Sequence, residues 1–232
     1  TTQLVARALH KGMTCLDIGA NIGYYVLLER KIIGEDGKII AIEPSPVNFR
    51  YLTNNLKLGN AENIEAYNIA AGDKNGEINF LIYEQASNSC MVIPEGQESR
   101  WPGKIIKVPV RTMDSFLEDL GVNKLDFLRM DVEGYELQIF EGMKNTIKKF
   151  KPIIQIEVHK SIMGNDNTRK FFQQLKNDGY DSHYYIPRDI DTPLIGTMKD
   201  VKNYNIDKLT EMLEDGTLPS FFILSLRIKS SS

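Results

Sequence analysis

The sequence predicts an α/β protein built on a mostly parallel, doubly wound sheet. The first 69 residues alternate between short apolar runs and segments with apolar residues at helical spacing, in the order β-α-β-α-β. A turn with two glycines, Ile18 to Gly23, follows the first apolar run. A later run, Leu125 to Met130, is bounded by polar residues, as is typical of a strand buried on both faces of a sheet.

Strands and helices alternate regularly in the first part of the chain. A short helix is expected over residues 2–9, before Gly12. The expected strands cover residues 13–17, 38–42 and 64–69, and the expected helices cover residues 24–33 and 47–58. Ser45 can cap the second of these helices and Pro46 can open it.

The middle of the chain departs from this alternation. Residues 77–83 and 105–110 are both typical of strands, and together they predict an inserted hairpin. The segment between them, residues 84–104, is polar and glycine-bearing. We expect it to be either a lid over a site or a plain connecting loop.

The last part of the chain returns to alternating elements. The expected helices cover residues 113–120, 135–150 with an interruption near Gly142, 168–178 and 207–213. The expected strands cover residues 125–130, 152–157, 180–186 and 221–228. No repeat or linker divides the chain, so we expect a single domain over residues 1–232, either independent or part of a longer polypeptide.

Composition argues against several classes of function. The formal net charge is −3 and no basic run occurs, so nucleic acid is not expected as the main partner. Cys15 and Cys90 form neither a disulfide framework nor a zinc motif. The apolar run Phe221 to Leu224 is far too short for a membrane span, and no signal peptide is visible. We therefore expect a cytoplasmic protein.

The glycine turn and the end of the next strand predict a binding site for a nucleoside cofactor. The spacing is Gly19-x-x-x-Gly23 preceded by Asp17, which differs from the dinucleotide pattern G-x-G-x-x-G. A carboxylate at this point disfavours a pyrophosphate and suits a cationic amine. Glu43 ends the next strand, where an acid can accept both hydroxyls of a ribose.

An amine and a ribose without a pyrophosphate describe S-adenosylmethionine. The structural alternative is that the two glycines only form a tight turn. The residues that we expect at this cofactor are Asp17, Gly19, Asn21, Gly23, Tyr24, Glu43, Ser45, Ala71, Asp73 and Asp131.

Five motifs together resemble one known family. They are Asp17-Ile-Gly-Ala-Asn-Ile-Gly23, Glu43-Pro-Ser-Pro46, Asn68-Ile-Ala-Ala-Gly72, Leu128-Arg-Met-Asp-Val-Glu-Gly-Tyr-Glu136 and Ile156-Glu-Val-His159. In this order they are similar to the FkbM-type methyltransferases, class I enzymes that use S-adenosylmethionine, many of them O-methyltransferases acting on sugars or natural products. The resemblance implies a Rossmann-like, mostly parallel seven-stranded sheet with a final antiparallel strand. It also implies that Asp17 to Gly23 lie at the methionine end of the cofactor and Glu43 at its ribose.

Polar residues gather where two central strands are expected to end. Asp131 and Glu157 end neighbouring strands, which lie about 4.8 Å apart, and Glu133 and His159 follow two residues later. This cluster provides the predicted catalytic residues Asp131, Glu157 and His159. Methyl transfer to an alcohol requires that the hydroxyl proton be removed or weakened.

Three interpretations of this cluster are open. In the first, Asp131, Glu157 and His159 bind Mn²⁺ or Mg²⁺, and the ion activates the acceptor hydroxyl. In the second, no metal is used, and His159 or Asp131 acts as a general base. In the third, the cluster is structural: Glu133 caps the next helix, Glu157 forms an ion pair, and His159 lies on the surface.

These observations predict an S-adenosylmethionine-dependent O-methyltransferase whose acceptor is a hydroxyl of a carbohydrate or another small polar molecule. Because sugar-modifying methyltransferases are often joined to glycosyltransferases, fusion to or cooperation with such an enzyme is a further expectation. One alternative is an NAD-dependent oxidoreductase with a similar fold, which binding of NAD instead of S-adenosylmethionine would identify. Another is a non-catalytic S-adenosylmethionine-binding module, which would bind the donor without turnover.

Overall fold

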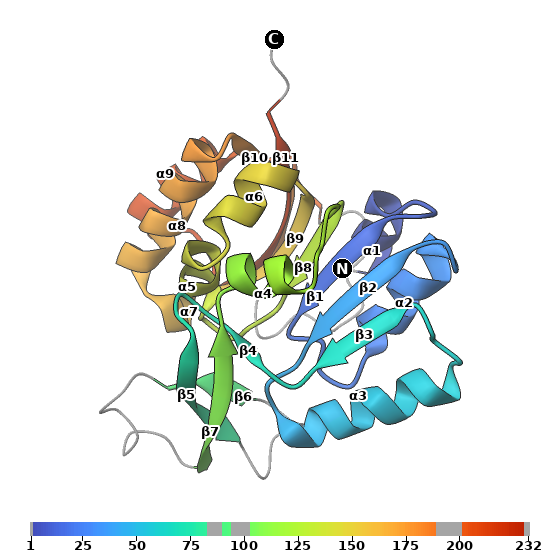
Figure 1. Cartoon of the computed structure of the whole chain (residues 1–232). Helices are drawn as coiled ribbons and strands as arrows, with labels where there is room; N and C mark the ends of the chain where they lie inside the picture. Colours follow the sequence, from blue (N-terminus) through green and yellow to red (C-terminus); the bar gives the residue numbers. More distant parts are fainter. Residues whose placement is uncertain (1, 83–89, 94–102, 189–200, 230–232) are drawn as a thin grey trace.

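A computed structural model describes residues 2–82, 90–93, 103–188 and 201–229 of the chain (Figure 1). The segment 84–104, expected to be either a lid or a plain connecting loop, falls largely outside these described residues. The described residues form two sheets, one with seven strands and one with four.

The seven-stranded sheet is the centre of the fold. Its strands, in spatial order, are β10 (Tyr180–Arg188), β11 (Phe221–Ile228), β9 (Ile153–His159), β8 (Phe127–Met130), β1 (Thr14–Ile18), β2 (Lys38–Ile42) and β3 (Ile64–Tyr67). Strands β9, β8, β1, β2 and β3 pair in parallel, and β11 pairs antiparallel with both β9 and β10. The predicted mostly parallel sheet with a final antiparallel strand is therefore confirmed.

Helices cover both faces of this sheet (Figure 1). One face packs against α1 (Thr2–Ala8), α2 (Tyr24–Ile33) and α3 (Pro46–Leu58). The other face packs against α4 (Met113–Asp119), α5 (Glu136–Glu141), α6 (Lys144–Phe150), α7 (Lys160–Met163), α8 (Asn165–Asn177) and α9 (Ile206–Glu214). All four residues of β8 are buried because helices lie on both sides, which explains why this strand is apolar apart from Arg129.

The smaller sheet is an insertion between β3 and α4. Its strands, in spatial order, are β4 (Ala70–Ala71), β7 (Lys104–Arg111), β5 (Gly76–Ile82) and β6 (Cys90–Val92). Strands β5 and β7 are antiparallel neighbours, as the predicted hairpin requires, and β4 and β6 extend it to four strands. In Figure 1 the arrows of β2 and β3 point toward this sheet, so it lies near the carboxyl edge of the main sheet.

Two local interactions explain where elements begin and end. The side-chain oxygen of Ser45 accepts a hydrogen bond from the Asn48 N–H and caps α3, as predicted. The Asn68 side-chain amide donates to the backbone oxygens of Glu43 and Pro44 at the end of β2. The chain therefore leaves the main sheet after Tyr67, two residues before the predicted end of this strand, and enters the smaller sheet.

The predicted interruption near Gly142 is confirmed, because α5 ends there and α6 begins at Lys144. A Cβ atom at Gly142 would lie 1.8 Å from the backbone oxygen of Gly72, so this position accepts only glycine. In the described part of the chain the longest helices have 13 residues, and none is long and apolar enough to cross a bilayer.

Replacing Leu128 with alanine tests the packing of the central strand. Leu128 is fully buried between the helix layers, so Leu128→Ala is expected to lower the free energy of unfolding by about 2 to 5 kcal/mol through lost burial and a residual cavity. Leu58→Ala is the matched control because Leu58 is 84% exposed, and its effect should stay within about 0.5 kcal/mol. Urea denaturation measures the free energy of unfolding of both variants. Equal losses in the two would contradict the assignment of Leu128 to the core.

Candidate active site

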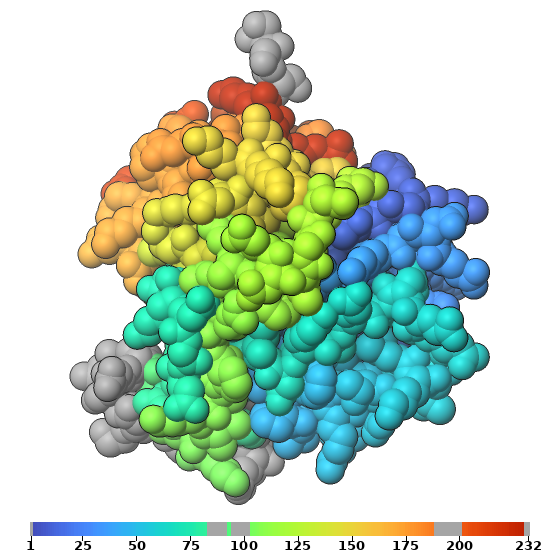
Figure 2. Space-filling view, viewed as in Figure 1, coloured from blue at the N-terminus to red at the C-terminus, as the bar shows by residue number. Residues whose placement is uncertain are grey.

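The carboxyl ends of β1, β2 and β8 open into a cavity of about 450 Å³. Open α/β sheets bind ligands at this edge. Phe80 of β5 and Val92 of β6 also line the cavity, and these two residues are directly opposite each other in the smaller sheet. In Figure 2 the smaller sheet (teal and light green) lies next to the α3 and β3 region on the surface of the molecule. Both sheets therefore form the cavity wall.

The turn after β1 passes very close to the end of β8. Gly19 has a φ of +84°, and a Cβ atom there would lie 2.0 Å from the backbone oxygen of Asp131. The N–H groups of Gly19 and Ala20 both donate to the backbone oxygen of Ile42, at 2.9 and 3.0 Å. Glycine at position 19 therefore lets three strand ends meet at one point.

Glu43 connects this turn to the end of β2. Its Oε2 atom accepts a hydrogen bond from the Asn21 N–H, and its Oε1 atom accepts one from the Ser45 N–H, both at 2.8 Å. Burial raises the pKa of Glu43 to about 7, although these two amides oppose the effect. Glu43 also lines the cavity, so a carboxylate oxygen is available at the position expected for a ribose.

Arg129 lines the cavity and lies between two carboxylates. Its Nη1 atom is 3.1 Å from Asp17 Oδ1, and its Nη2 atom is 3.0 Å from Asp131 Oδ2. The Tyr25 ring centroid lies 3.9 Å from the guanidinium carbon, within the range of a cation–π contact. Burial lowers the pKa of Arg129, but Asp17 and Asp131 outweigh it and raise the pKa above its usual value. The guanidinium is therefore charged and forms ion pairs with both acids, although burial still raises the pKa of Asp17.

Asp17 and Glu29 add buried acidity beneath the same wall. Asp17 is fully buried and does not line the cavity, contrary to the expectation that it faces the ligand directly. Among the described residues, neither side-chain oxygen of Glu29 and only one of Asp17 has a hydrogen-bond partner. Burial raises the pKa of Glu29 well above its usual range, so Glu29 favours its protonated form.

His159 is buried behind the cavity wall. Its Nδ1 atom lies 2.8 Å from Glu136 Oε1, and its Nε2 atom lies 3.4 Å from Glu133 Oε2 and 4.0 Å from Asp131 Oδ1. Burial alone would lower the pKa of His159. The three carboxylates have a larger effect in the opposite direction and raise this pKa to about 9. The imidazole is therefore cationic at neutral pH.

The structure brings six of the ten expected cofactor residues to the cavity: Gly19, Asn21, Tyr24, Glu43, Ala71 and Asp131. The others are near it but do not line it. Gly23 begins α2, Ser45 caps α3, Asp73 is exposed beyond the end of β4, and Asp17 contacts Arg129.

The predicted metal site is not supported. In the part of the chain that the structure describes, no group of three or more His, Cys, Asp or Glu side chains is arranged to hold an ion. The physical reason is that the side chains have other partners. Asp131 binds Arg129, and His159 directs Nδ1 to Glu136, while the partly buried Glu157 precedes His159 in β9 and does not line the cavity.

Several residues of the site are not predicted from the sequence. Phe80, Val92, Tyr135 and Ile139 line the cavity, and Glu136 holds His159. Glu136 stands in the acidic motif that ends β8, which is the one available signal. Tyr135 stands in the same motif, whereas Phe80, Val92 and Ile139 carry no signal, because apolar and aromatic residues occur throughout the core.

A family model described as "Methyltransferase FkbM domain" matches residues 17–182. The methyltransferase sdnD of Sordaria araneosa is 28% identical over 155 residues, which cover 55% of this chain and 59% of that protein. The hexuronic acid methyltransferase AglP of Haloferax volcanii is 27% identical over 155 residues, which cover 66% of this chain and 59% of that protein. The chain therefore spans less than two thirds of the length of these relatives.

Solved structures share the fold. The structure of methyltransferase FkbM from Methylobacillus flagellatus KT has a TM-score of 0.51 at 16% identity, and the match covers 76% of this chain and 44% of that chain. The structure of SMU.1697c from Streptococcus mutans, in complex with SAH, has a TM-score of 0.53 at 9% identity and covers 97% of this chain and 94% of that chain. At these identities the likeness concerns the fold alone.

Removing the Arg129 charge is expected to destabilise the site. In Arg129→Met the buried Asp17 loses its cation, so the free energy of unfolding should fall by about 3 to 5 kcal/mol at neutral pH. Arg169→Met is the control, since Arg169 forms exposed ion pairs with Asp166 and Glu214 and should change stability little. Chemical denaturation measures both variants. An equally small change in the two would show that Asp17 does not depend on Arg129.

Proposed function

The chain belongs to the methyltransferase FkbM domain family, and from this membership we propose that it is an S-adenosylmethionine-dependent methyltransferase. Its acceptor is a hydroxyl group of a carbohydrate or another small polar molecule. The observation that carries the proposal is one cavity lined both by Glu43 and the Gly19 turn and by the acids Asp131 and Glu133. Glu43 and the Gly19 turn suit a nucleoside donor, whereas Asp131 and Glu133 suit a hydroxylated acceptor.

The residues on the donor side fit S-adenosylmethionine. Glu43 offers carboxylate oxygens to the ribose hydroxyls, and the missing side chain of Gly19 leaves room for close approach to the backbone. Ala71 and Phe80 provide an apolar surface suited to an adenine ring. Once bound, the donor supplies an electrophilic methyl group on a positively charged sulfur.

On the acceptor side, Asp131 is the proposed general base. The acceptor oxygen forms a bond to the methyl carbon while the carbon–sulfur bond breaks and its electron pair passes to sulfur. The hydroxyl proton is transferred to Asp131, which lines the cavity. Arg129 binds Asp131 Oδ2, which leaves Oδ1 as the atom that accepts this proton.

His159 is less suited than Asp131 to act as the base. Its side chain is 4% exposed and does not line the cavity, whereas the side chain of Asp131 is 31% exposed. With a pKa raised to about 9 by its carboxylate neighbours, His159 already carries a proton at neutral pH. We therefore assign the base role to Asp131.

A carbohydrate acceptor is supported by one relative and by the chemistry of the wall. The AglP protein is named as a hexuronic acid methyltransferase. Asp131 and Glu133 present carboxylates beside the aromatic Tyr135, a combination that suits hydrogen bonding to hydroxyls next to an apolar sugar face. A dinucleotide oxidoreductase is disfavoured by the Gly19-x-x-x-Gly23 spacing and by the family match.

The proposal is tested with methyl-labelled S-adenosylmethionine and a panel of neutral hexoses, hexuronic acids and their glycosides. Label in a sugar would support the function. A methyl ether survives mild alkali, whereas a methyl ester releases methanol, so the same assay separates a hydroxyl from a carboxylate acceptor. Donor binding without transfer to any acceptor would favour a non-catalytic binding module, and no donor binding would contradict the proposal.

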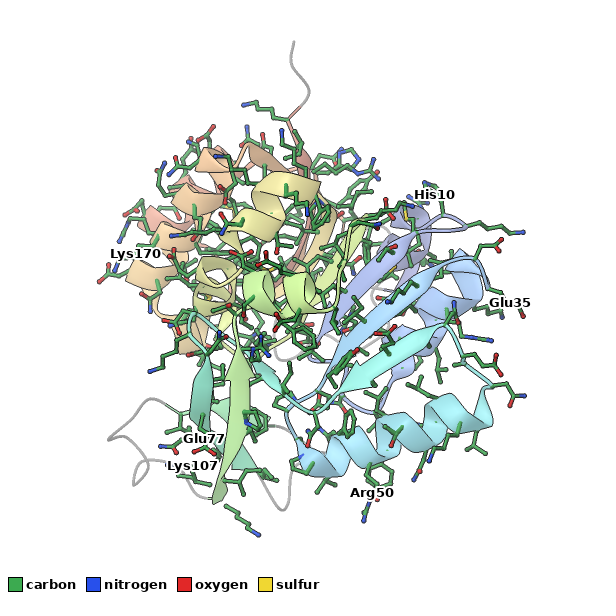
Figure 3. All side chains as sticks on the ribbon, viewed as in Figure 1. His10, Glu35, Arg50, Glu77, Lys107 and Lys170 are labelled. Carbon is green, nitrogen blue, oxygen red and sulfur yellow. The ribbon has the colours of Figure 1, made fainter. Side chains whose placement is uncertain are left out.

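Glu43→Gln is expected to weaken binding of S-adenosylmethionine about 10- to 100-fold, as the loss of a hydrogen bond to a charged group implies. Isothermal titration measures this affinity. Glu35→Gln provides the matched control, because Glu35 is exposed and lies at the periphery in Figure 3. If both variants bind the donor as the wild type does, Glu43 has no role in donor binding.

The same carboxylate predicts a pH dependence. Glu43 has a pKa raised to about 7, so it is protonated below this pH and accepts ribose hydroxyls less well. Donor affinity should therefore rise as the pH increases from about 5.5 to 7.5, and the rise should be absent in Glu43→Gln. An identical pH profile in wild type and variant would contradict this assignment.

Asp131→Asn is expected to reduce the turnover number about 10²- to 10⁴-fold, the range typical of a lost general base. Donor affinity should stay within a few-fold, because the variant keeps the shape of the wall and loses mainly the proton acceptor. Asp36→Asn, at an exposed loop position, is the control. Single-turnover kinetics with an identified acceptor measure the effect, and full activity of Asp131→Asn would assign the base elsewhere.

A further inference from the structure

Glu136 joins the turn after β8 to the end of β9 through a single oxygen atom. This fully buried Oε1 atom accepts hydrogen bonds from the Gly134 N–H at 3.2 Å and the His159 N–H at 3.2 Å, and it contacts His159 Nδ1 at 2.8 Å. Desolvating a carboxylate is unfavourable unless donors compensate it. The three donors therefore compensate the burial of Oε1, whereas Oε2 of Glu136 is buried without a hydrogen-bond partner among the described residues.

The turn that Glu136 holds has an unfavourable backbone conformation. Glu133 has a φ of +52° and Gly134 a φ of +93°, so two consecutive residues lie in the left-handed region. A Cβ atom at Gly134 would lie 2.3 Å from the side chain of Ile162 in α7. Such a conformation persists only where its surroundings fix it, and it is concentrated at functional sites. Glu136 on one side and Ile162 on the other fix this turn.

His159 passes this constraint on to the cavity. Glu136 fixes Nδ1, so Nε2 is directed at Glu133 Oε2 (3.4 Å) and Asp131 Oδ1 (4.0 Å). The side chains of these two acids are 41% and 31% exposed and line the cavity, whereas His159 is buried. The ring of Phe221 in β11 packs edge-on against the imidazole and closes its other side.

We propose that Glu136 and His159 form a positioning pair that holds Asp131 and Glu133 on the acceptor side of the cavity. This inference rests on the proposed function. Without Glu136, the imidazole loses the partner that sets its orientation, and Asp131 and Glu133 are no longer held in position for the acceptor. The donor side, which depends on Glu43 and the Gly19 turn, stays as it is. The pair therefore affects turnover and not donor affinity.

The test combines histidine NMR with kinetics on the full chain. The chain has three histidines, and His159→Asn assigns the resonance of His159 among them. The titration midpoint of this resonance is compared in the wild type, Glu136→Gln and Glu133→Gln. Glu141→Gln is the matched control, because Glu141 lies on the same helix but is exposed and contacts Lys144. Donor affinity and turnover are measured on the same samples, with the acceptor found in the sugar panel.

The expected midpoint in the wild type is near 9, and Glu136→Gln should lower it by about 1 to 3 pH units. The turnover number should fall about 10- to 100-fold with unchanged donor affinity, as expected for misplaced reacting groups. Glu133→Gln changes a partly exposed position that should tolerate the substitution, and it should lower both the His159 midpoint and the turnover number. Glu141→Gln should change neither the midpoint nor the turnover number.

An unchanged His159 midpoint in Glu136→Gln would overturn the pair. So would a lowered midpoint with full turnover, which would mean a purely structural contact. Failure of the proposed function is distinguishable, because the wild type would then not bind S-adenosylmethionine while the midpoint still reports the contact between Glu136 and His159.

Discussion

The guanidinium of Arg129 lies between the carboxylates of Asp17 and Asp131, in β1 and after β8. Two acids at neighbouring strand ends repel each other, and burial adds a desolvation penalty. The charge of Arg129, which the ring of Tyr25 covers, offsets part of this repulsion and of this penalty, although burial still raises the pKa of Asp17. The two strand ends also approach each other closely, because a Cβ atom at Gly19 would lie 2.0 Å from the backbone oxygen of Asp131. The ion pairs of Arg129 thus stabilise this part of the cavity wall.

The two sheets contribute different properties to the cavity. The main sheet provides polar groups at fixed positions, since parallel strands end at the same edge. The smaller sheet provides shape, through the opposed pair Phe80 and Val92. Its charged residues Glu77 and Lys107 lie on its outer part in Figure 3, with their side chains 3.8 Å apart. A change in the smaller sheet can therefore alter the shape of the cavity without moving the acids of the main sheet.

The sequence predicts the fold well because the strands buried on both faces, such as β8 with its single Arg129, are mostly apolar runs with acids or glycines at their ends. Glu43 and Asp131 are predicted for the same reason, since their types and positions at strand ends indicate chemistry. The contact of His159 with Glu136 is not predictable, because the two are 23 residues apart and meet only in the folded chain. This contact explains why His159 is buried, and the sequence alone leaves its role open between metal ligand, base and surface residue.

The position of β11 has a consequence for the order in which the sheet is completed. This strand, Phe221–Ile228, lies between β9 and β10, although both precede it in the sequence. During synthesis, β9 and β10 therefore emerge with unpaired edges, which can associate with other chains. The ring of Phe221 packs against His159 only after β11 enters. A nascent chain that stops before residue 221 would hold most of its site residues and yet keep two unpaired strand edges, so the sheet and the site are completed only after β11 has been synthesised.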